Sequence, residues 1–270
     1  LEFRRVLFRS VGTGEVARGR MPYLALEWID GGLLRDHLHE GSPVAVDEAV
    51  AYTQQLCDAL EYCHSQGIVH RDLKPDNIMI GRDGKIRLID FGASLLDGAP
   101  RITTSSISPA LGTPDYMSPE QVQGKRGDVR SDIYALGAML YELLTGYPPY
   151  RGDTALAVMA QHVQSSPAPM RSKVRSVPPA LEAITFKAMR RDPSLRYQSM
   201  ASLRADLTAL ATLDAAAIWA EAPDEGPGSA SIAGANTNAK PRAIASWVPW
   251  LIAGVSTAVV AIGAAIALTR

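Results

Sequence analysis

The chain has 270 residues, 47% of them hydrophobic, and a formal net charge of −1 at pH 7. This length and composition allow one sizeable core with appendages, and the near-zero charge excludes a general attraction to nucleic acid or to an anionic membrane surface. The two cysteines, Cys57 and Cys63, argue against a disulfide framework and fit buried thiols in a reducing compartment.

The first ten residues, LEFRRVLFRS, do not begin with methionine. They can be back-translated as CTG GAG TTC AGA CGT GTG CTC TTC CGA TCT, which resembles a sequencing-library adapter. We therefore expect residues 1–10 to be a non-native scar, to be excluded from fold reasoning, with the gene continuing upstream of Val11. The alternative is a basic amphipathic arm.

Residues 11–30 predict two strands joined by a polar turn. Gly12-Thr13-Gly14 is assigned to a turn, because a lone GxG is a weak phosphate-loop signal. A short helix at 33–39 follows Gly31-Gly32. Asp47 then predicts the cap of a longer helix, which Gly67 ends.

One face of this longer helix carries residues spaced three and four apart, which predicts a buried stripe. We interpret the histidine at its end as a satisfied core residue rather than a ligand. The stripe consists of Val50, Thr53, Cys57, Leu60 and His64.

The central motif is HRDLKPDN at 70–77, followed by a hairpin at 78–89 and by Asp90-Phe91-Gly92. The hairpin places Asn77 and Asp90 at adjacent strand ends. This pattern resembles the eukaryotic-type protein kinases, and more closely their bacterial receptor-like serine/threonine members. The resemblance runs from about Val11 to about Leu210 and does not include a glycine-rich loop or an ATP-anchoring lysine.

The resemblance implies ATP and Mg²⁺ or Mn²⁺ as cofactors. Asp72 would orient the attacking hydroxyl and accept its proton, with Lys74 beside the transferred phosphate. The Lys74-Pro75 pair and Thr113, which would touch both Asp72 and Lys74, favour serine or threonine substrates. Asn77 and Asp90 would bind the metal ions. The adenine pocket would comprise Leu26, Glu27, Ile29 and Met79.

The activation segment, 92–118, is rich in hydroxyl groups. Arg71 before the catalytic aspartate implies a phosphate receptor, so we expect autophosphorylation in trans, within a homodimer, at one or more of Thr103, Thr104, Ser105 and Ser106. Three residues are expected to be structural supports. Glu120 would pair with Arg196, and Asp132 would open a helix over 133–144 and hold the backbone of the His70 loop.

The remaining helices are predicted at 155–164, 179–189 and 199–213, with a proline-bearing linker at 165–179. Residues 213–242 predict a flexible juxtamembrane linker. The 22 uncharged residues from Trp247 to Leu268 predict a transmembrane helix within 243–270, because they could extend about 33 Å. A buried core helix is the alternative for this segment.

We therefore predict an α+β, protein-kinase-like fold with a partial small lobe at 11–30, a large lobe at 31–212 and a C-terminal transmembrane helix. The predicted protein is a single-pass cell-membrane serine/threonine kinase with a cytoplasmic catalytic domain, protein substrates and no nucleic-acid partner. The chain itself, read as N-terminally truncated, is expected to be inactive. The alternative is a membrane-tethered pseudokinase that acts as a binding module. A small-molecule phosphotransferase is disfavoured by the sequence at 112–120.

Overall fold

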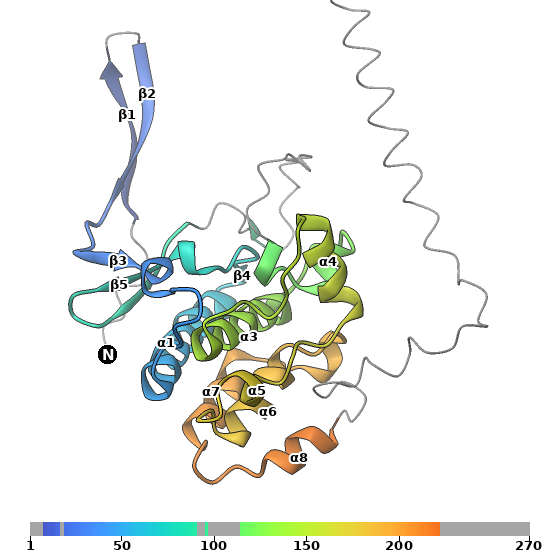
Figure 1. Ribbon diagram of the computed structural model, residues 1–270. Helices are drawn as coiled ribbons and strands as arrows, with labels where there is room; N and C mark the ends of the chain where they lie inside the picture. Colours follow the sequence, from blue (N-terminus) through green and yellow to red (C-terminus); the bar gives the residue numbers. More distant parts are fainter. Residues whose placement is uncertain (1–7, 17–18, 91–94, 97–113, 222–270) are drawn as a thin grey trace, which may run out of the picture. The chain divides into compact units, whose positions relative to one another are not determined.

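A computed structural model of the chain describes residues 8–16, 19–90, 95–96 and 114–221, with side chains described at 27–90 and 114–221. All of these residues belong to one compact unit, Leu1–Ala230. Figure 1 shows the elements in chain order. The strands are β1 (Phe8–Val16), β2 (Gly19–Leu26), β3 (Gly31–Leu33), β4 (Ile68–Val69), β5 (Ile78–Gly81), β6 (Ile86–Leu88) and β7 (Leu95–Leu96). The α-helices are α1 (Val46–Ser65), α2 (Pro119–Val122), α3 (Val129–Thr145), α4 (Ala155–Gln164), α5 (Met170–Lys173), α6 (Pro179–Ala188), α7 (Met200–Thr208) and α8 (Ala215–Ala220). The described residues also form four short 3₁₀ turns, η1 (Leu34–His37), η2 (Pro75–Asn77), η3 (Pro114–Tyr116) and η4 (Pro193–Leu195).

Strands β1 and β2 form the predicted antiparallel pair. The turn predicted at Gly12-Thr13-Gly14 is wrong, because these residues lie inside β1, where Gly12 is opposite Tyr23 and Gly14 is opposite Met21. They pair with β2 in an antiparallel ladder, and the chain reverses its direction between Val16 and Gly19. Strand β1 begins at Phe8, inside the segment 1–10 that the sequence predicts to be non-native.

A three-stranded antiparallel sheet, β3-β5-β6, carries the predicted hairpin. Strand β3 pairs with β5, so the chain leaving residues 27–30 lies beside the hairpin that follows the central motif. Gly84, with φ of 69°, closes the β5–β6 turn in the left-handed region. The helix predicted at 33–39 is a shorter 3₁₀ turn, η1.

The helices pack around α3, which is buried along almost its whole length. Helix α3 contacts α1 and α6, and α1 also packs against α7. The predicted stripe on α1 faces this core, with Thr53, Cys57 and Leu60 fully buried.

Two helix starts differ from the prediction. Helix α1 begins at Val46 after Ala45, so Asp47 lies in the first turn, where its charge favours the helix N-terminus, and is not the cap. Helix α3 begins at Val129, one turn before the predicted start, because the side chain of Asp128 accepts a hydrogen bond from Arg130 N and caps it. Asp132 therefore lies in the first turn of α3.

The end of α3 needs a glycine. Gly146 has φ of 75°, and a Cβ there would lie 2.6 Å from Ser42 N. The loop before α1 approaches this residue closely, since Gly41 N donates to Gly146 O over 3.0 Å. Any larger residue would therefore separate the loop from the end of α3.

The C-terminal helices are close to the prediction, with three differences. Helix α7 ends at Thr208, five residues before the predicted end at Leu213. A short helix, α5, lies within the predicted 165–179 linker. Helix α8 lies at 215–220, in a segment predicted to be flexible, and buries Ile218. The rings of Trp219 and Phe186 lie 5.5 Å apart, and Arg190 Nη2 donates to Ile218 O over 2.7 Å, so α8 docks on α6. Apolar contact explains why α8 is ordered. The large side chains of Ile218 and Trp219 are enough to hold this short helix on the core. No helix within the described ranges is long and apolar enough to cross a membrane, and residues 222–270, with the predicted span, lie outside them.

Candidate active site

The loop between β4 and β5 brings three predicted catalytic residues together. Lys74 Nζ donates to Asp72 Oδ2 over 2.8 Å, and Asn77 Nδ2 donates to the same oxygen over 3.2 Å. Asn77 Nδ2 also donates to the Asp72 carbonyl oxygen over 2.7 Å. Asn77 is buried, whereas 44% of the Asp72 side chain is exposed. The loop thus fixes one carboxylate oxygen of Asp72 and leaves the other without a partner among the described residues.

The backbone of this loop is held from α3. Asp132 is buried and accepts hydrogen bonds from His70 N over 2.9 Å and from Arg71 N over 2.8 Å. The third partner of this carboxylate is His64, whose Nε2 lies 2.8 Å from Asp132 Oδ2. The histidine predicted to be a satisfied core residue therefore has a partner. Arg71 has φ of 66°, a strained value that these contacts stabilise.

The side chains of His70 and Arg71 lie beside the contacts that Asp132 makes with the loop backbone. His70 is fully buried, and burial lowers its pKa although the charges of Asp132 and Asp72 oppose the shift. Burial therefore disfavours the protonated form of this imidazole. Arg71 Nε donates to Gly127 O, and Gln121 Nε2 donates to Arg71 O over 2.8 Å. The loop is therefore also connected to α2 and to the segment that precedes α3.

The predicted metal ligands flank the hairpin. Asn77 ends η2 and Asp90 follows β6, and Ile89 N donates to Asn77 O over 2.9 Å, which joins their strand ends. Because the Asn77 amide nitrogen is used by Asp72, its amide oxygen is the atom that could bind a cation. In the described part of the chain, no three His, Cys, Asp or Glu side chains gather in a way that could hold a metal ion. Mg²⁺ is commonly held by one or two protein oxygens together with phosphate oxygens, which this pair fits.

The predicted adenine-binding residues lie on β2, on the segment between β2 and β3, and on β5. Leu26 ends β2, and its side chain is outside the described set. Ile29 is buried, with 8% of its surface exposed, whereas its neighbour Trp28 is 89% exposed. The Glu27 carbonyl and the Ile29 N–H make no hydrogen bond to another described residue. Met79, half-buried on β5, pairs with Leu33 of β3.

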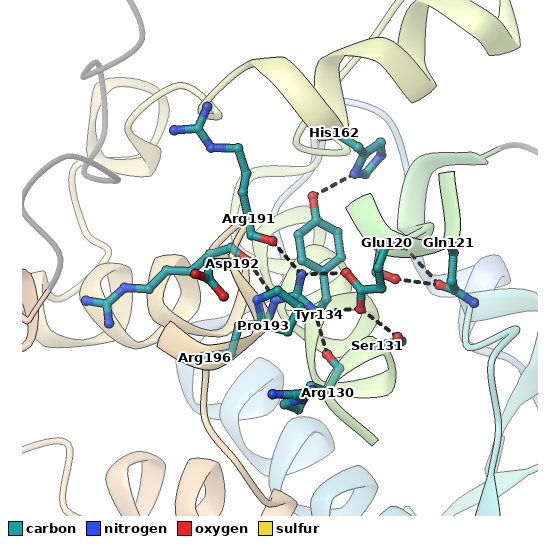
Figure 2. A network of polar contacts seen from close by, with 12 residues as sticks. Glu120, Gln121, Arg130, Ser131, Tyr134, His162, Arg191, Asp192, Pro193 and Arg196 are labelled. Carbon is teal, nitrogen blue, oxygen red and sulfur yellow. Dashed lines mark hydrogen bonds and ion pairs between the residues drawn. The ribbon is translucent and has the colours of Figure 1, made fainter. Parts of the chain in front are cut away.

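A buried ion pair joins α2 to the segment after η4 (Figure 2). Arg196 donates from Nη1 to Glu120 Oε1 and from Nη2 to Glu120 Oε2, both over 2.8 Å. Ser131 Oγ donates to Glu120 Oε1 over 2.6 Å, and the Arg196 guanidinium lies 4.9 Å from the Tyr134 ring centre. Burial alone would raise the pKa of Glu120, but hydrogen bonds and charge from Arg196 outweigh it, so the pKa is lowered. The expected contact between these two residues is thus present in the fold.

A second cluster, which the sequence did not reveal, surrounds Arg35 of η1. Arg35 Nη2 donates to Tyr116 OH over 2.8 Å and lies 3.3 Å from Asp76 Oδ2, while Nη1 lies 3.2 Å from Glu142 Oε1. Tyr116 OH also donates to Glu142. These contacts outweigh the effect of burial and raise the pKa of Arg35. The Arg35 cluster therefore ties the catalytic loop to α3 and to η3.

Several predicted site residues lie outside the described residues. They are Thr113, Thr103, Thr104, Ser105 and Ser106. Their roles, and the expected contacts of Thr113 with Asp72 and Lys74, stay predictions.

Comparison with known proteins agrees with this geometry. The protein kinase domain profile matches residues 14–207. The serine/threonine-protein kinase PknB of Mycolicibacterium smegmatis (strain ATCC 700084 / mc(2)155) is 42% identical over 200 residues, which cover 73% of this chain and 32% of that protein. PknB of Mycobacterium leprae (strain TN) is 39% identical over 200 residues, with the same coverage of both chains. The probable serine/threonine-protein kinase SCO3848 of Streptomyces coelicolor is 41% identical over 189 residues, which cover 70% of this chain and 28% of that protein.

The chain spans about a third of the length of these relatives. The matched region includes the catalytic loop, the hairpin and the Glu120–Arg196 pair, all described above. The chain therefore belongs to the protein kinase family, among the bacterial serine/threonine kinases of eukaryotic type.

Proposed function

We propose that the protein containing this chain transfers the γ-phosphate of ATP to serine and threonine hydroxyls of proteins. The observation that carries the proposal is the loop in which Asp72, Lys74 and Asn77 meet, held from α3 by Asp132. Phosphoryl transfer asks a protein mainly to position groups and to neutralise charge, and this loop offers both.

The residues of the loop have separate tasks in this proposal. Lys74 and Asn77 hold Oδ2 of Asp72, so the other oxygen is oriented to accept the hydroxyl proton of the substrate. The Lys74 ammonium, which is 28% exposed, would place a positive charge beside the transferred phosphate. Asn77 and Asp90 would hold Mg²⁺ or Mn²⁺, which supplies charge neutralisation when bound.

The nucleotide would lie against the segment between β2 and β3. The Glu27 carbonyl and the Ile29 N–H are one acceptor and one donor with no partner among the described residues, which suits an adenine edge. Leu26 and Met79 would bound the ring from the ends of β2 and β5.

The regulatory part of the proposal concerns the activation segment. We infer that Thr103, Thr104, Ser105 or Ser106 is phosphorylated in trans by a second copy, and that Arg71 binds the phosphate. Phosphopeptide mapping of the active protein tests this inference. Phosphate at one or more of these residues is expected, and an unmodified segment in a fully active protein would contradict it.

We further propose that residues 243–270 anchor the protein in the cell membrane by one helix, with the kinase domain on the cytoplasmic side. The uncharged run from Trp247 to Leu268, with tryptophans at one end, supports this proposal. Fractionation of cells that express the full gene product, with and without residues 243–270, tests it. Loss of membrane association on deletion is the expected result, and association that survives the deletion would refute a single anchor at this site.

Kinase activity is tested by transfer of labelled phosphate from ATP to a generic protein substrate in the presence of Mg²⁺. The 270 residues contain neither a glycine-rich G-x-G-x-x-G-x-V loop nor the usual strand lysine, so the chain by itself is expected to be inactive. A gene product that also carries both of these elements is expected to be active. Its Asp72→Asn variant should lose at least about a hundredfold in kcat, since a positioned base contributes that much.

Three other outcomes would contradict parts of this proposal. Transfer by the isolated chain would refute the expectation of inactivity. No transfer by the gene product, or a rate that Asp72→Asn leaves unchanged, would favour a pseudokinase that acts as a membrane-tethered binding module.

A further inference from the structure

A cavity of about 250 Å³ opens beside the Arg35 cluster. The residues that matter for its charge are Arg35, Glu40, Asp115, Glu142 and Arg151. A second, shallower depression shares Asp115 and Arg151 with it and continues to the start of α4. Asp115 therefore stands on the wall between the two hollows.

Four of the five charges in this cavity are paired with each other. Arg35 Nη1 lies 3.2 Å from Glu142 Oε1, and Arg151 Nη2 lies 2.6 Å from Glu40 Oε1. The Asp115 carboxylate makes no ion pair or side-chain hydrogen bond with another described residue. One half-buried negative charge is thus left to face the cavity.

The surroundings of Asp115 disfavour an uncompensated charge. Burial, and then the nearby Glu142 of α3, raise its pKa to about 6, while Arg35 and Arg151 act in the opposite direction. From α4, His162 contacts the backbone of Asp115 and stays neutral, because burial lowers the pKa of His162 to about 4. An additional cation in the cavity would relieve the repulsion between the two carboxylates.

One residue on the wall of the cavity also contacts the catalytic loop. Arg35, on its wall, bonds Asp76, which is four residues after Asp72. Asp115 follows the activation segment residue Thr113 by two positions. A peptide whose hydroxyl reaches Asp72 would therefore place neighbouring side chains near this cavity.

The chain itself contains a matching peptide. Arg101 is the only basic residue between Gly92 and Ser118, and it precedes Thr103 by two residues and Thr104 by three. These are two of the hydroxyl residues for which phosphorylation in trans is proposed above.

We propose that this cavity is a substrate subsite for a cationic side chain, with Asp115 as the counter-ion, and that Arg101 of a second copy occupies it when Thr103 or Thr104 is presented to Asp72. The inference rests on the proposed kinase function and adds a substrate preference and a determinant for it. A charge-assisted hydrogen bond in a half-buried site gives selectivity as well as affinity.

The test measures peptide binding without ATP, so that it does not depend on phosphoryl transfer. A fluorescent peptide with the sequence of residues 97–108 and its Arg101→Ala form are titrated with the purified chain at pH 7.5, and anisotropy is recorded. The arginine peptide is expected to bind about fivefold more tightly, as a partly shielded ion pair allows. In Asp115→Asn the two peptides should bind equally.

Two variants and one change of pH act as controls. Asp153→Asn removes an exposed carboxylate from the neighbouring depression and should keep the preference for arginine. Asp115→Glu retains the charge and should keep most of the preference, which separates loss of charge from misfolding. At pH 5.5 the preference should shrink, because part of Asp115 is then protonated.

Several results would overturn the subsite. They are equal binding of both peptides to the unmodified chain, no measurable binding of either, or a preference that survives Asp115→Asn. Equal effects of Asp115→Asn and Asp153→Asn would show a general electrostatic attraction instead. Tighter binding of a peptide phosphorylated at Thr103 would identify an anion site. Because ATP is absent, failure here is distinguishable from failure of the kinase assay.

Discussion

The Glu120–Arg196 pair allows the sharpest test of how this fold is held together. Glu120→Gln preserves the shape of the side chain and removes its charge. Arg196, whose side chain is fully buried, would then be an uncompensated cation among backbone carbonyls of Arg130 and Arg191. Breaking a buried pair from one side typically costs about 3–5 kcal/mol. Gln keeps one acceptor oxygen, so we expect about 3 kcal/mol.

Urea denaturation followed by circular dichroism measures this loss. With an m value of about 3 kcal/mol/M, the midpoint should fall by about 1 M. The matched control is Asp30→Asn, which removes a carboxylate from an ion pair with Arg82 in which both side chains are mostly exposed. The control should lose less than about 1 kcal/mol. If both variants shifted the midpoint equally, the assignment of Glu120 as a structural support would be refuted.

The same pair predicts a dependence on pH. The pKa of Glu120 in the folded protein lies below its ordinary value of 4.5. Its contribution to stability is therefore complete above that value and is lost as the pH falls through the lower, folded-state pKa. Below pH 4.5 the difference in unfolding free energy between the unmodified protein and Glu120→Gln should shrink, and a constant difference would contradict the lowered pKa.

Two further predictions concern the loop anchor and the last helix. Asp132→Asn weakens the hydrogen bonds from His70 N and Arg71 N. It should lower the free energy of unfolding, measured by urea denaturation, by about 2–3 kcal/mol and the kcat of the active gene product by at least about tenfold. Unchanged values would show that the loop keeps its shape without Asp132. Ile218→Ala should cost about 2–4 kcal/mol, because Ile218 is 5% exposed within α8. An unchanged urea midpoint for this variant would favour the flexible linker that the sequence predicts there.

Elements with strong local signals were predictable. Helix α4 has the predicted bounds because Thr154 caps it and its apolar spacing is regular. The β5–β6 hairpin followed from alternating apolar residues around a glycine-containing turn.

Where local signals were weak or ambiguous, packing decided the outcome. Gly12-Thr13-Gly14 lies in a strand because it pairs with β2. Helix α8 forms because it packs against an apolar face of α6.

The sequence by itself predicted the candidate catalytic loop, because the residues proposed to be catalytic lie within one short segment whose spacing is local. Asp72, Lys74 and Asn77 meet wherever that loop adopts its turn. Only the tertiary structure decided which distant charges are paired. The Arg35 cluster joins residues up to 107 positions apart, and it leaves Asp115 unpaired among the described residues. Such contacts depend on how the helices pack. The spacing of charged residues along the sequence does not indicate which distant residues they pair with.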